Sequence, residues 1–225
     1  MIKRHFFYFL GSILLLFSFG SNAIKAQSSA SASASASFEG IIVYDMLYED
    51  RLGLLTKEQA KLFLGDQYTY TVKGNHYKSE MNGLLLTTQY YLGGDTLYTH
   101  TKNTSSLTWN DVRQNGDSLI RVETQTNVDT IQGFICDRLS IYSKKGVYHY
   151  YYNTQFALNP SDYAHHAFGF SDVFASKTKS LPLKIVTDTK EAYSVSIAKH
   201  IEAKKIDDSV FNYPNQLRRV ANPYK

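Results

Sequence analysis

Apolar and polar residues alternate along most of the chain after Phe38. The alternation is clearest over residues 68–72, 181–185 and 193–197, where every second side chain is apolar. Such a pattern buries one face of a strand and leaves the other in water, which is typical of antiparallel sheets. Turn signals rich in Gly, Asn and Asp separate the runs, at residues 73–75, 82–83, 93–95, 115–117 and 144–146. The pattern predicts a mostly β protein, a single curved antiparallel sheet made of successive hairpins that close toward a half-barrel.

One short segment breaks this alternation. Thr56 and Gln59 have the spacing of a capping box, in which each side chain bonds the backbone of the other residue. Apolar residues then follow at helical spacing, and Gly65 is a natural helix stop. We therefore expect a short helix over residues 56–64, packed on or near the mouth of the sheet.

A second irregular region covers residues 156–179 and is the longest stretch without clean alternation. It holds four phenylalanines, one proline and the adjacent pair His165 and His166. A long connection that carries apolar side chains usually lies against the core or covers an opening. We expect this loop to cover the concave face of the sheet.

The N-terminal residues have the features of an export signal. Lys3 and Arg4 precede an apolar run over residues 6–19, which is shorter than the roughly 20 residues of a membrane-spanning helix. We expect cleavage after Ala26, with Ala23 as the rival site and an uncleaved anchor as the alternative. The expected organisation is a signal peptide (1–26), a Ser/Ala low-complexity linker (27–37), a single β-rich ligand-binding-like domain (38–214) and a C-terminal tail (215–225).

The export signal also changes the meaning of the charge. The formal net charge of the chain is +4, from 24 basic and 20 acidic residues, but three of the basic residues lie in the signal. A nearly neutral mature chain with mixed signs does not suit nucleic acid or an anionic membrane surface. The predicted location is the periplasm or cell envelope, with an extracellular location left open and no transmembrane segment after signal removal.

Few residues suggest chemistry. Cys136 is the only cysteine and lies in an apolar run, so we interpret it as a buried structural residue rather than a nucleophile. His165, His166 and Asp162 are the nearest approach to a metal cluster, but adjacent residues of an extended segment point to opposite sides. The common hydrolase, nucleotide and dinucleotide motifs are absent. We expect no metal, no cofactor and no catalytic residue, with an unmarked hydrolase as a minor alternative.

The unusual feature of the composition is tyrosine, with 18 residues against a single tryptophan. Strands favour aromatic side chains, so ordinary β packing is one explanation. The other is a groove lined by rings that have an apolar body and a polar tip, which suits a lipid, a glycan or an apolar peptide.

Four short motifs resemble an exported bacterial domain family of unknown function that is related to the LolA/LolB lipoprotein-carrier superfamily. The motifs are Phe38-Glu39-Gly40-Ile41-Ile42-Val43-Tyr44, Thr130-Ile131-Gln132-Gly133-Phe134-Ile135-Cys136, Leu181-Pro182-Leu183 and Asp208-Ser209-Val210-Phe211-Asn212-Tyr213-Pro214. The resemblance covers residues 38–214 and implies a half-closed, LolA-like sheet around an apolar groove, with helices as a lid. This chain shows only one obvious lid helix in its pattern, the one expected at residues 56–64.

These observations predict an exported, non-enzymatic protein that binds an apolar or amphipathic ligand, a lipid or a lipoprotein acyl chain, in the groove of the sheet. The expected groove residues are Tyr68, Tyr70, Tyr90, Trp109, Tyr150, Phe168 and Phe170. The alternative is an envelope protein–protein interaction module with an envelope protein as its partner and no small-molecule ligand.

Overall fold

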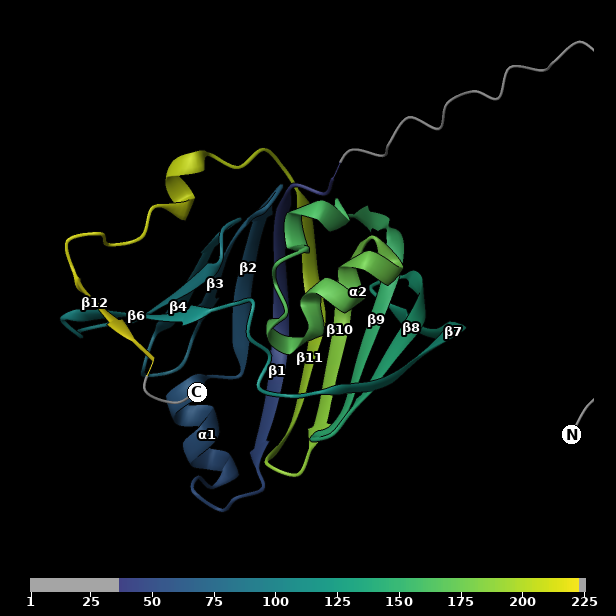
Figure 1. The fold of residues 1–225 in the computed structure, drawn as a ribbon, viewed down its shortest axis with the longest axis horizontal. Helices are drawn as coiled ribbons and strands as arrows, with labels where there is room; N and C mark the ends of the chain where they lie inside the picture. Colours follow the sequence, from purple (N-terminus) through teal and green to yellow (C-terminus); the bar gives the residue numbers. More distant parts are fainter. Residues whose placement is uncertain (1–36, 223–225) are drawn as a thin grey trace, which may run out of the picture. The chain divides into compact units, whose positions relative to one another are not determined.

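The structure, a computed structural model, describes residues 37–222. The expected signal peptide and all of the expected linker except Ser37 lie outside the described residues. In the part described, one sheet of 12 strands runs in the order β12-β6-β5-β4-β3-β2-β1-β11-β10-β9-β8-β7 (Figure 1). The strands are β1 (Gly40–Asp50), β2 (Gln67–Lys73), β3 (His76–Met81), β4 (Thr87–Leu92), β5 (Thr96–Thr101), β6 (Ser106–Asp111), β7 (Leu119–Ile131), β8 (Phe134–Ser143), β9 (Gly146–Ala157), β10 (Ser180–Thr189), β11 (Ala192–Ala203) and β12 (Arg218–Ala221).

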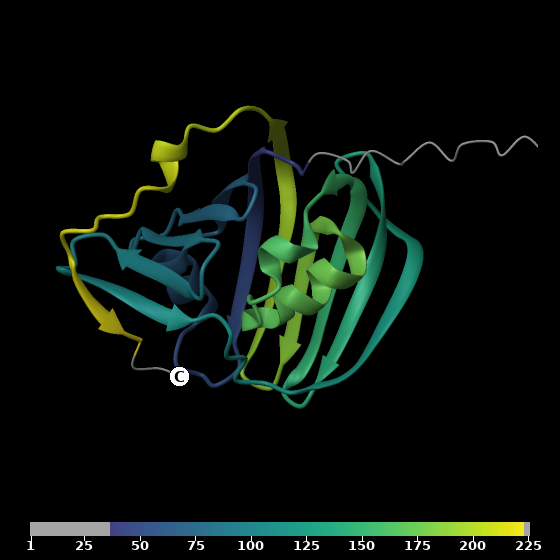
Figure 2. The ribbon, with the colours of Figure 1, turned by 45° about the horizontal axis from the view of Figure 1, so that its top comes forward.

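Neighbouring strands are antiparallel except for β12, which lies parallel to β6. The sheet is open and curved, with β12 and β7 at its two edges (Figure 2). The fold class expected from the alternation is therefore confirmed. Strand β12 belongs to residues 215–225, which the sequence analysis set apart as a tail, so part of that tail joins the sheet.

The connection between β6 and β7 is long in space although it is short in sequence. Residues 112–118 carry the chain from the β12 side of the sheet to the opposite edge, across its concave side (Figure 1, Figure 2). The Phe168 N–H donates to the Val112 carbonyl at 3.0 Å, and the Tyr148 hydroxyl donates to the Asp117 carboxylate at 3.4 Å. The crossing is thereby tied both to strand β9 of the sheet and to Phe168, in the connection between β9 and β10.

Helix α1 (Lys57–Leu64) forms where the capping pattern predicted it. The Thr56 hydroxyl accepts from the Gln59 N–H at 3.2 Å, and the Gln59 side chain accepts from the Thr56 N–H at 2.9 Å. Gly65 ends the helix with φ of 95°, a conformation that glycine adopts without strain. The helix lies beyond one end of β1 and does not cover the concave face (Figure 1).

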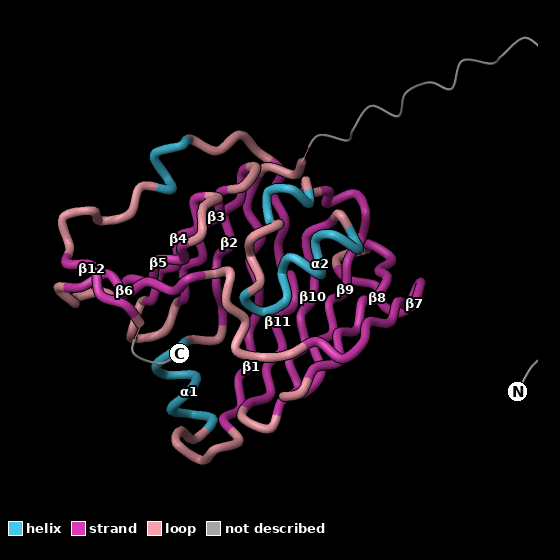
Figure 3. The backbone as a smooth tube through the Cα atoms, in the orientation of Figure 1, coloured by secondary structure: helices cyan, strands magenta, loops and turns pink. Residues whose placement is uncertain are grey.

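The concave face is covered instead by residues 158–179, which we call the covering segment. It contains two 3₁₀ turns, η1 (Pro160–Tyr163) and η2 (Phe168–Phe170), followed by helix α2 (Ser171–Thr178) (Figure 3). A third 3₁₀ turn, η3 (Asp208–Phe211), lies in the connection to β12. The covering segment is thus partly helical where the sequence predicted a loop, and α2 is a second helix beside the expected one.

Two clusters of buried side chains hold this arrangement together. One includes Ile42, Val72, Leu97 and Leu183 of the sheet. The other joins Phe170 and Phe174 of the covering segment to strands β8 and β9, with the Phe174 ring stacked on Tyr150 at 4.7 Å. Burial of such rings is the main force that fixes a covering element on a sheet. Among residues 37–222, no helix has both the length and the apolar character needed to span a bilayer.

Candidate functional site

An inner cavity of about 460 Å³ lies between the concave face of the sheet and the covering segment. Its aromatic lining consists of Tyr44, Tyr68, Tyr70, Tyr77, Tyr150, Tyr163, Phe168 and Phe174. Aliphatic side chains also line it, from Met46, Met81, Leu97, Leu158, Leu181 and Ile185, together with the uncharged polar residues Ser79, Gln89, Ser171, Thr187, Ser194 and Ser196. The cavity falls within the usual range for a site that holds a small organic ligand, roughly 300–1,000 Å³.

The strand register explains why these tyrosines face inward. Tyr44 lies opposite Tyr68, and Tyr70 lies opposite Ser79. Directly opposed residues of antiparallel strands project from the same face of the sheet. The alternation that the sequence shows over β2 therefore places two tyrosines of this strand, Tyr68 and Tyr70, in the cavity wall.

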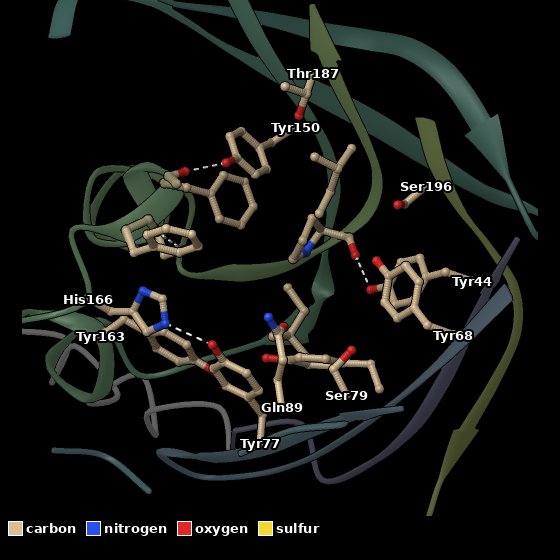
Figure 4. Close-up of a pocket in the computed structure, with 18 of the residues that line it drawn as sticks. Tyr44, Tyr68, Tyr77, Ser79, Gln89, Tyr150, Tyr163, His166, Thr187 and Ser196 are labelled. Carbon is tan, nitrogen blue, oxygen red and sulfur yellow. Dashed lines mark hydrogen bonds between the residues drawn. The ribbon is translucent and has the colours of Figure 1, made fainter. Parts of the chain in front are cut away.

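One side of the cavity is built around a pair of stacked rings, Tyr44 and Tyr68, whose centroids are 4.8 Å apart (Figure 4). The Tyr44 hydroxyl donates to the Pro182 carbonyl at 2.6 Å, which holds the ring in place. Burial raises the pKa of the Tyr68 hydroxyl to about 12, although a hydrogen bond with Ser196 opposes the shift. Both tyrosines are therefore neutral at physiological pH.

The opposite side of the cavity carries His166 and Tyr77 (Figure 4). The His166 ring nitrogen Nε2 and the Tyr77 hydroxyl share a hydrogen bond of 2.8 Å. His166 is only 3% exposed, and this burial lowers the pKa of its imidazole. The imidazole is therefore neutral at neutral pH and acts as a hydrogen-bonding group rather than a charge.

The neighbouring His165 has the opposite environment. Its side chain is exposed, and its Nδ1 lies 3.1 Å from the Asp95 carboxylate. The two histidines thus lie in different environments, although the chain forms a turn at residues 164–165 rather than an extended segment. Among the residues that the structure describes, no group of three or more His, Cys, Asp or Glu side chains could hold a metal ion.

Of the seven expected groove residues, the structure brings four together. Tyr68, Tyr70, Tyr150 and Phe168 all line the inner cavity. The Tyr150 hydroxyl donates to the Gly169 carbonyl, so this tyrosine also fastens the covering segment to the sheet (Figure 4).

Tyr90 lies elsewhere, because the register turns it to the other face of the sheet. It is opposite Lys78 and Tyr98, and its ring packs 6.2 Å from Tyr213. The inward tyrosine of that strand is its neighbour Tyr91, which is fully buried and packs 5.2 Å from Tyr77.

Trp109 and Phe170 are also outside the inner cavity. Trp109 is opposite Tyr98 in the sheet and borders a second pocket. Phe170 is buried and its ring contacts Tyr148 edge-on at 5.3 Å. Left-handed backbone at Gly169 and Phe170, with φ of 64° and 59°, makes a sharp turn that separates Phe168 at the cavity from Phe170 in the core.

The sequence analysis missed several lining residues. Tyr44, Tyr77, Tyr163, His166 and Phe174 all line the cavity. Alternation carried a signal for Tyr44, which follows Ile42 at a spacing of two in β1. No periodic signal marked Tyr163 and His166, because the covering segment has no regular strand or helix at those positions.

The second pocket, which we call the outer pocket, has a volume of about 790 Å³ and shares Phe168, Gly169 and Thr187 with the inner cavity. Its lining is mixed. Apolar side chains such as Leu52, Leu54 and Leu55 line it together with five charged residues: Asp50, Asp111, Asp117, Lys145 and Glu191. Most of these groups already have partners. Asp50 accepts from three backbone N–H groups, and a hydrogen bond from Arg113 holds the pKa of Asp111 well below its usual range.

Cys136 is fully buried in β8, and its Sγ lies 3.3 Å from the Phe134 carbonyl. Burial raises the pKa of the thiol, which keeps it protonated at neutral pH. The geometry fits the structural role expected for this residue.

Comparisons with known proteins show similarity in structure alone. No family model matches the chain, and no curated protein matches it. Two crystal forms of PNGF-II match with TM-scores of 0.44 and 0.40 at 11% and 12% identity, and cover 83% and 80% of this chain. The match spans only about a third of PNGF-II, 32% and 31% of its chain in the two forms.

A LolA superfamily protein from Nitrosomonas europaea, NE2245, also matches. Its TM-score is 0.37 at 12% identity, and the match covers 78% of this chain and 90% of that one. At TM-scores this low, these similarities carry no argument about function, which has to come from the site itself.

Proposed function

We propose that this protein is an exported, non-enzymatic binding protein that holds an apolar or amphipathic ligand, such as a lipid or a lipoprotein acyl chain, in the inner cavity. The observation that carries the proposal is the lining of this cavity. Among the described residues that line it, none is Asp, Glu, Lys or Arg, and most are aromatic or aliphatic. A cavity of this kind favours hydrocarbon, because transfer of apolar surface out of water is favourable by roughly 25 cal/mol per Å².

The chemistry of the lining also supports a binding role over catalysis. His166, the only imidazole among the described residues of the wall, bonds a tyrosine whose pKa is raised by burial. A general base activates a nucleophile that loses its proton readily, whereas a buried tyrosine holds its proton more tightly. This pair is therefore poorly suited to nucleophilic catalysis.

Two measurements test the proposal. Native mass spectrometry of protein recovered from the envelope of the cells that express it, followed by organic extraction, should show a discrete adduct that extracts as lipid. In vitro, an apolar fluorescent probe, N-phenyl-1-naphthylamine, should bind the delipidated protein.

A blocking variant locates the site. Ser196 lines the inner cavity, so Ser196→Trp should fill it and weaken probe binding at least about tenfold. Gln114→Trp, in the outer pocket, is the matched control and should leave the affinity unchanged. Circular dichroism of both variants establishes that they fold. Equal affinities of the two variants for the probe would contradict the proposal.

A second candidate function is an interaction module that docks an envelope protein. The observation that favours it is a group of exposed leucines around α1. Leu52 and Leu54 precede the helix, Leu62 lies on it, and the Leu84 N–H donates to the Leu62 carbonyl at 2.9 Å; all four side chains are more than half exposed. This candidate predicts a clean mass with no adduct, together with a specific cross-link from this surface to one envelope protein.

A further inference from the structure

Four polar side chains meet at one side of the inner cavity, and we call them the tyrosine–histidine cluster. They are Tyr70, Tyr77, Tyr163 and His166, and they come from β2, β3, η1 and the connection after η1. The Tyr70 and Tyr77 rings are 5.1 Å apart, and the Tyr163 and His166 rings are 6.2 Å apart. Figure 4 shows Tyr77, Tyr163 and His166 on the side of the cavity away from Tyr44 and Tyr68.

This cluster has hydrogen-bonding capacity that the protein itself does not use. Tyr77 is bonded to His166. The Tyr163 hydroxyl interacts with the Tyr70 hydroxyl, and the His166 ring interacts with the backbone of Phe168, but neither the Tyr163 hydroxyl nor the His166 Nδ1 has a hydrogen bond of good geometry among the described residues. Tyr163 is only 5% exposed, so bulk water does not satisfy its hydroxyl. Buried polar groups are almost always paired in folded proteins, and an unpaired one is unfavourable. A buried hydroxyl that lacks a well-formed hydrogen bond in a cavity wall therefore points to a partner that arrives with the ligand.

The cluster is polar without being charged. Burial raises the pKa of Tyr77 and of Tyr70, raises that of Tyr163 to about 12, and lowers that of His166. All four groups are therefore neutral near pH 7. No ionised side chain lines the cavity in the described residues, so an ion placed there would lose its hydration without meeting an opposite charge.

Most of the rest of the wall is apolar, and the polar residues in it are uncharged: Ser79, Gln89, Ser171, Thr187, Ser194 and Ser196. Met46, Met81, Ile185 and Phe174 line the cavity with no ionisable group among them. A molecule that fills the space would thus lay its chain along these residues and present a polar group to the cluster.

We infer that the tyrosine–histidine cluster binds an uncharged oxygen-bearing group, a hydroxyl or a carbonyl, on the ligand. The inference rests on the proposed function and narrows it. The ligand is a neutral amphiphile such as a long-chain alcohol or an acylglycerol, and neither a fatty-acid anion nor an alkylammonium ion.

The test is displacement of N-phenyl-1-naphthylamine from the full protein by three compounds with the same chain: 1-dodecanol, dodecanoate and dodecylammonium. The two ions are used below their micelle concentrations and 1-dodecanol below its solubility limit, at pH 8. We expect dodecanol to displace the probe at a concentration at least about tenfold lower than either ion, since only the ions lose hydration without compensation. Displacement by either ion as readily as by dodecanol would overturn the inference.

Variants that remove a single oxygen identify the cluster. Tyr77→Phe and Tyr163→Phe keep the rings. Each should weaken the affinity for dodecanol about five- to tenfold, with little change in the affinity for the probe. Tyr142→Phe is the matched control, because its hydroxyl bonds Glu123 at 3.0 Å and lies outside the cavity. If both cluster variants bind dodecanol as tightly as the wild type, the hydroxyl of dodecanol contacts another part of the wall, and the inference is overturned.

The two proposals fail in different ways. If the probe does not bind the wild-type protein at all, the proposed function is wrong and the cluster has no ligand of this class. If the probe binds and Ser196→Trp blocks it, but charge makes no difference among the three displacing compounds, only the inference about the cluster is wrong. Melting temperatures of the variants separate loss of a hydroxyl from loss of the fold.

Discussion

The inner cavity and the outer pocket share Phe168, Gly169 and Thr187, yet they differ in chemistry. Four acidic side chains and one lysine line the outer pocket, whereas the described lining of the inner cavity has no ionised side chain. The outer pocket lies where the residue 112–118 crossing and the loop after β1 meet, and loops carry charged residues at the surface. The inner cavity lies between two layers that are held together by apolar contacts.

This difference shows that the volume of a pocket alone does not determine which ligand it binds. The outer pocket is the larger of the two, but its carboxylates are already engaged, as the hydrogen bond between Asp111 and Arg113 shows. Exposed ion pairs of this kind contribute little and are weakened by salt. The smaller cavity has a lining without ionised side chains and a buried hydroxyl, that of Tyr163, without a well-formed hydrogen bond, which is why the ligand is assigned to it.

The largest expected effect concerns the two phenylalanines of the covering segment that line the inner cavity. Phe174 is 4% exposed and stacks on Tyr150, so Phe174→Ala should lower the free energy of unfolding by about 3–5 kcal/mol. Phe168 borders both hollows and is 46% exposed, so Phe168→Ala should cost about 1 kcal/mol or less. Urea unfolding measures both. Similar losses for the two variants would show that the covering segment is not anchored through Phe174.

An intermediate effect should follow from the neutral imidazole of the inner cavity. Burial lowers the pKa of His166 below its unfolded value of about 6.5, so the unfolded state binds the proton first as pH falls. Stability is therefore highest above about pH 6.5 and decreases as pH falls toward the folded pKa, by at most about 1.4 kcal/mol per pH unit for one proton.

Urea unfolding at pH 7.5 and 5.5 checks this effect. His166→Gln should be less stable than the wild type at pH 7.5 but should lose less stability between the two values. His165→Gln, which removes the exposed neighbour, is the control and should keep the wild-type pH dependence. His149, whose pKa burial also lowers, is present in all three proteins and contributes equally. Identical slopes in the wild type and His166→Gln would argue against a buried neutral imidazole.

The sequence predicted the parts of the fold that depend on local signals. The capping box of Thr56 and Gln59 and the stop at Gly65 are complete within ten residues, and α1 forms there. The alternation of β2 likewise predicted the inward positions of Tyr68 and Tyr70.

The parts that were missed depend on pairing between distant residues. In β4, Tyr90 and Tyr91 are adjacent and chemically identical, and only the register with β3 and β5 decides that Tyr91 faces inward. A shift of one residue exchanges the two faces of a strand, so composition cannot choose between such neighbours. The crossing from β6 to the far edge at β7 is equally invisible in the sequence, because a turn signal at residues 115–117 is compatible with a simple hairpin.

The smallest expected effect concerns the only tryptophan of the chain. Trp109 borders the outer pocket and is opposite Tyr98 in the sheet, so Trp109→Phe should change the affinity of the inner cavity for N-phenyl-1-naphthylamine less than about twofold. Tyr98→Phe, on the same face, is the matched control and should behave alike. A tenfold loss in Trp109→Phe alone would mean that a ligand reaches past Phe168 into both hollows. In that case the charged outer pocket would contribute to ligand choice. The inner cavity and the outer pocket would then be the two ends of one binding site.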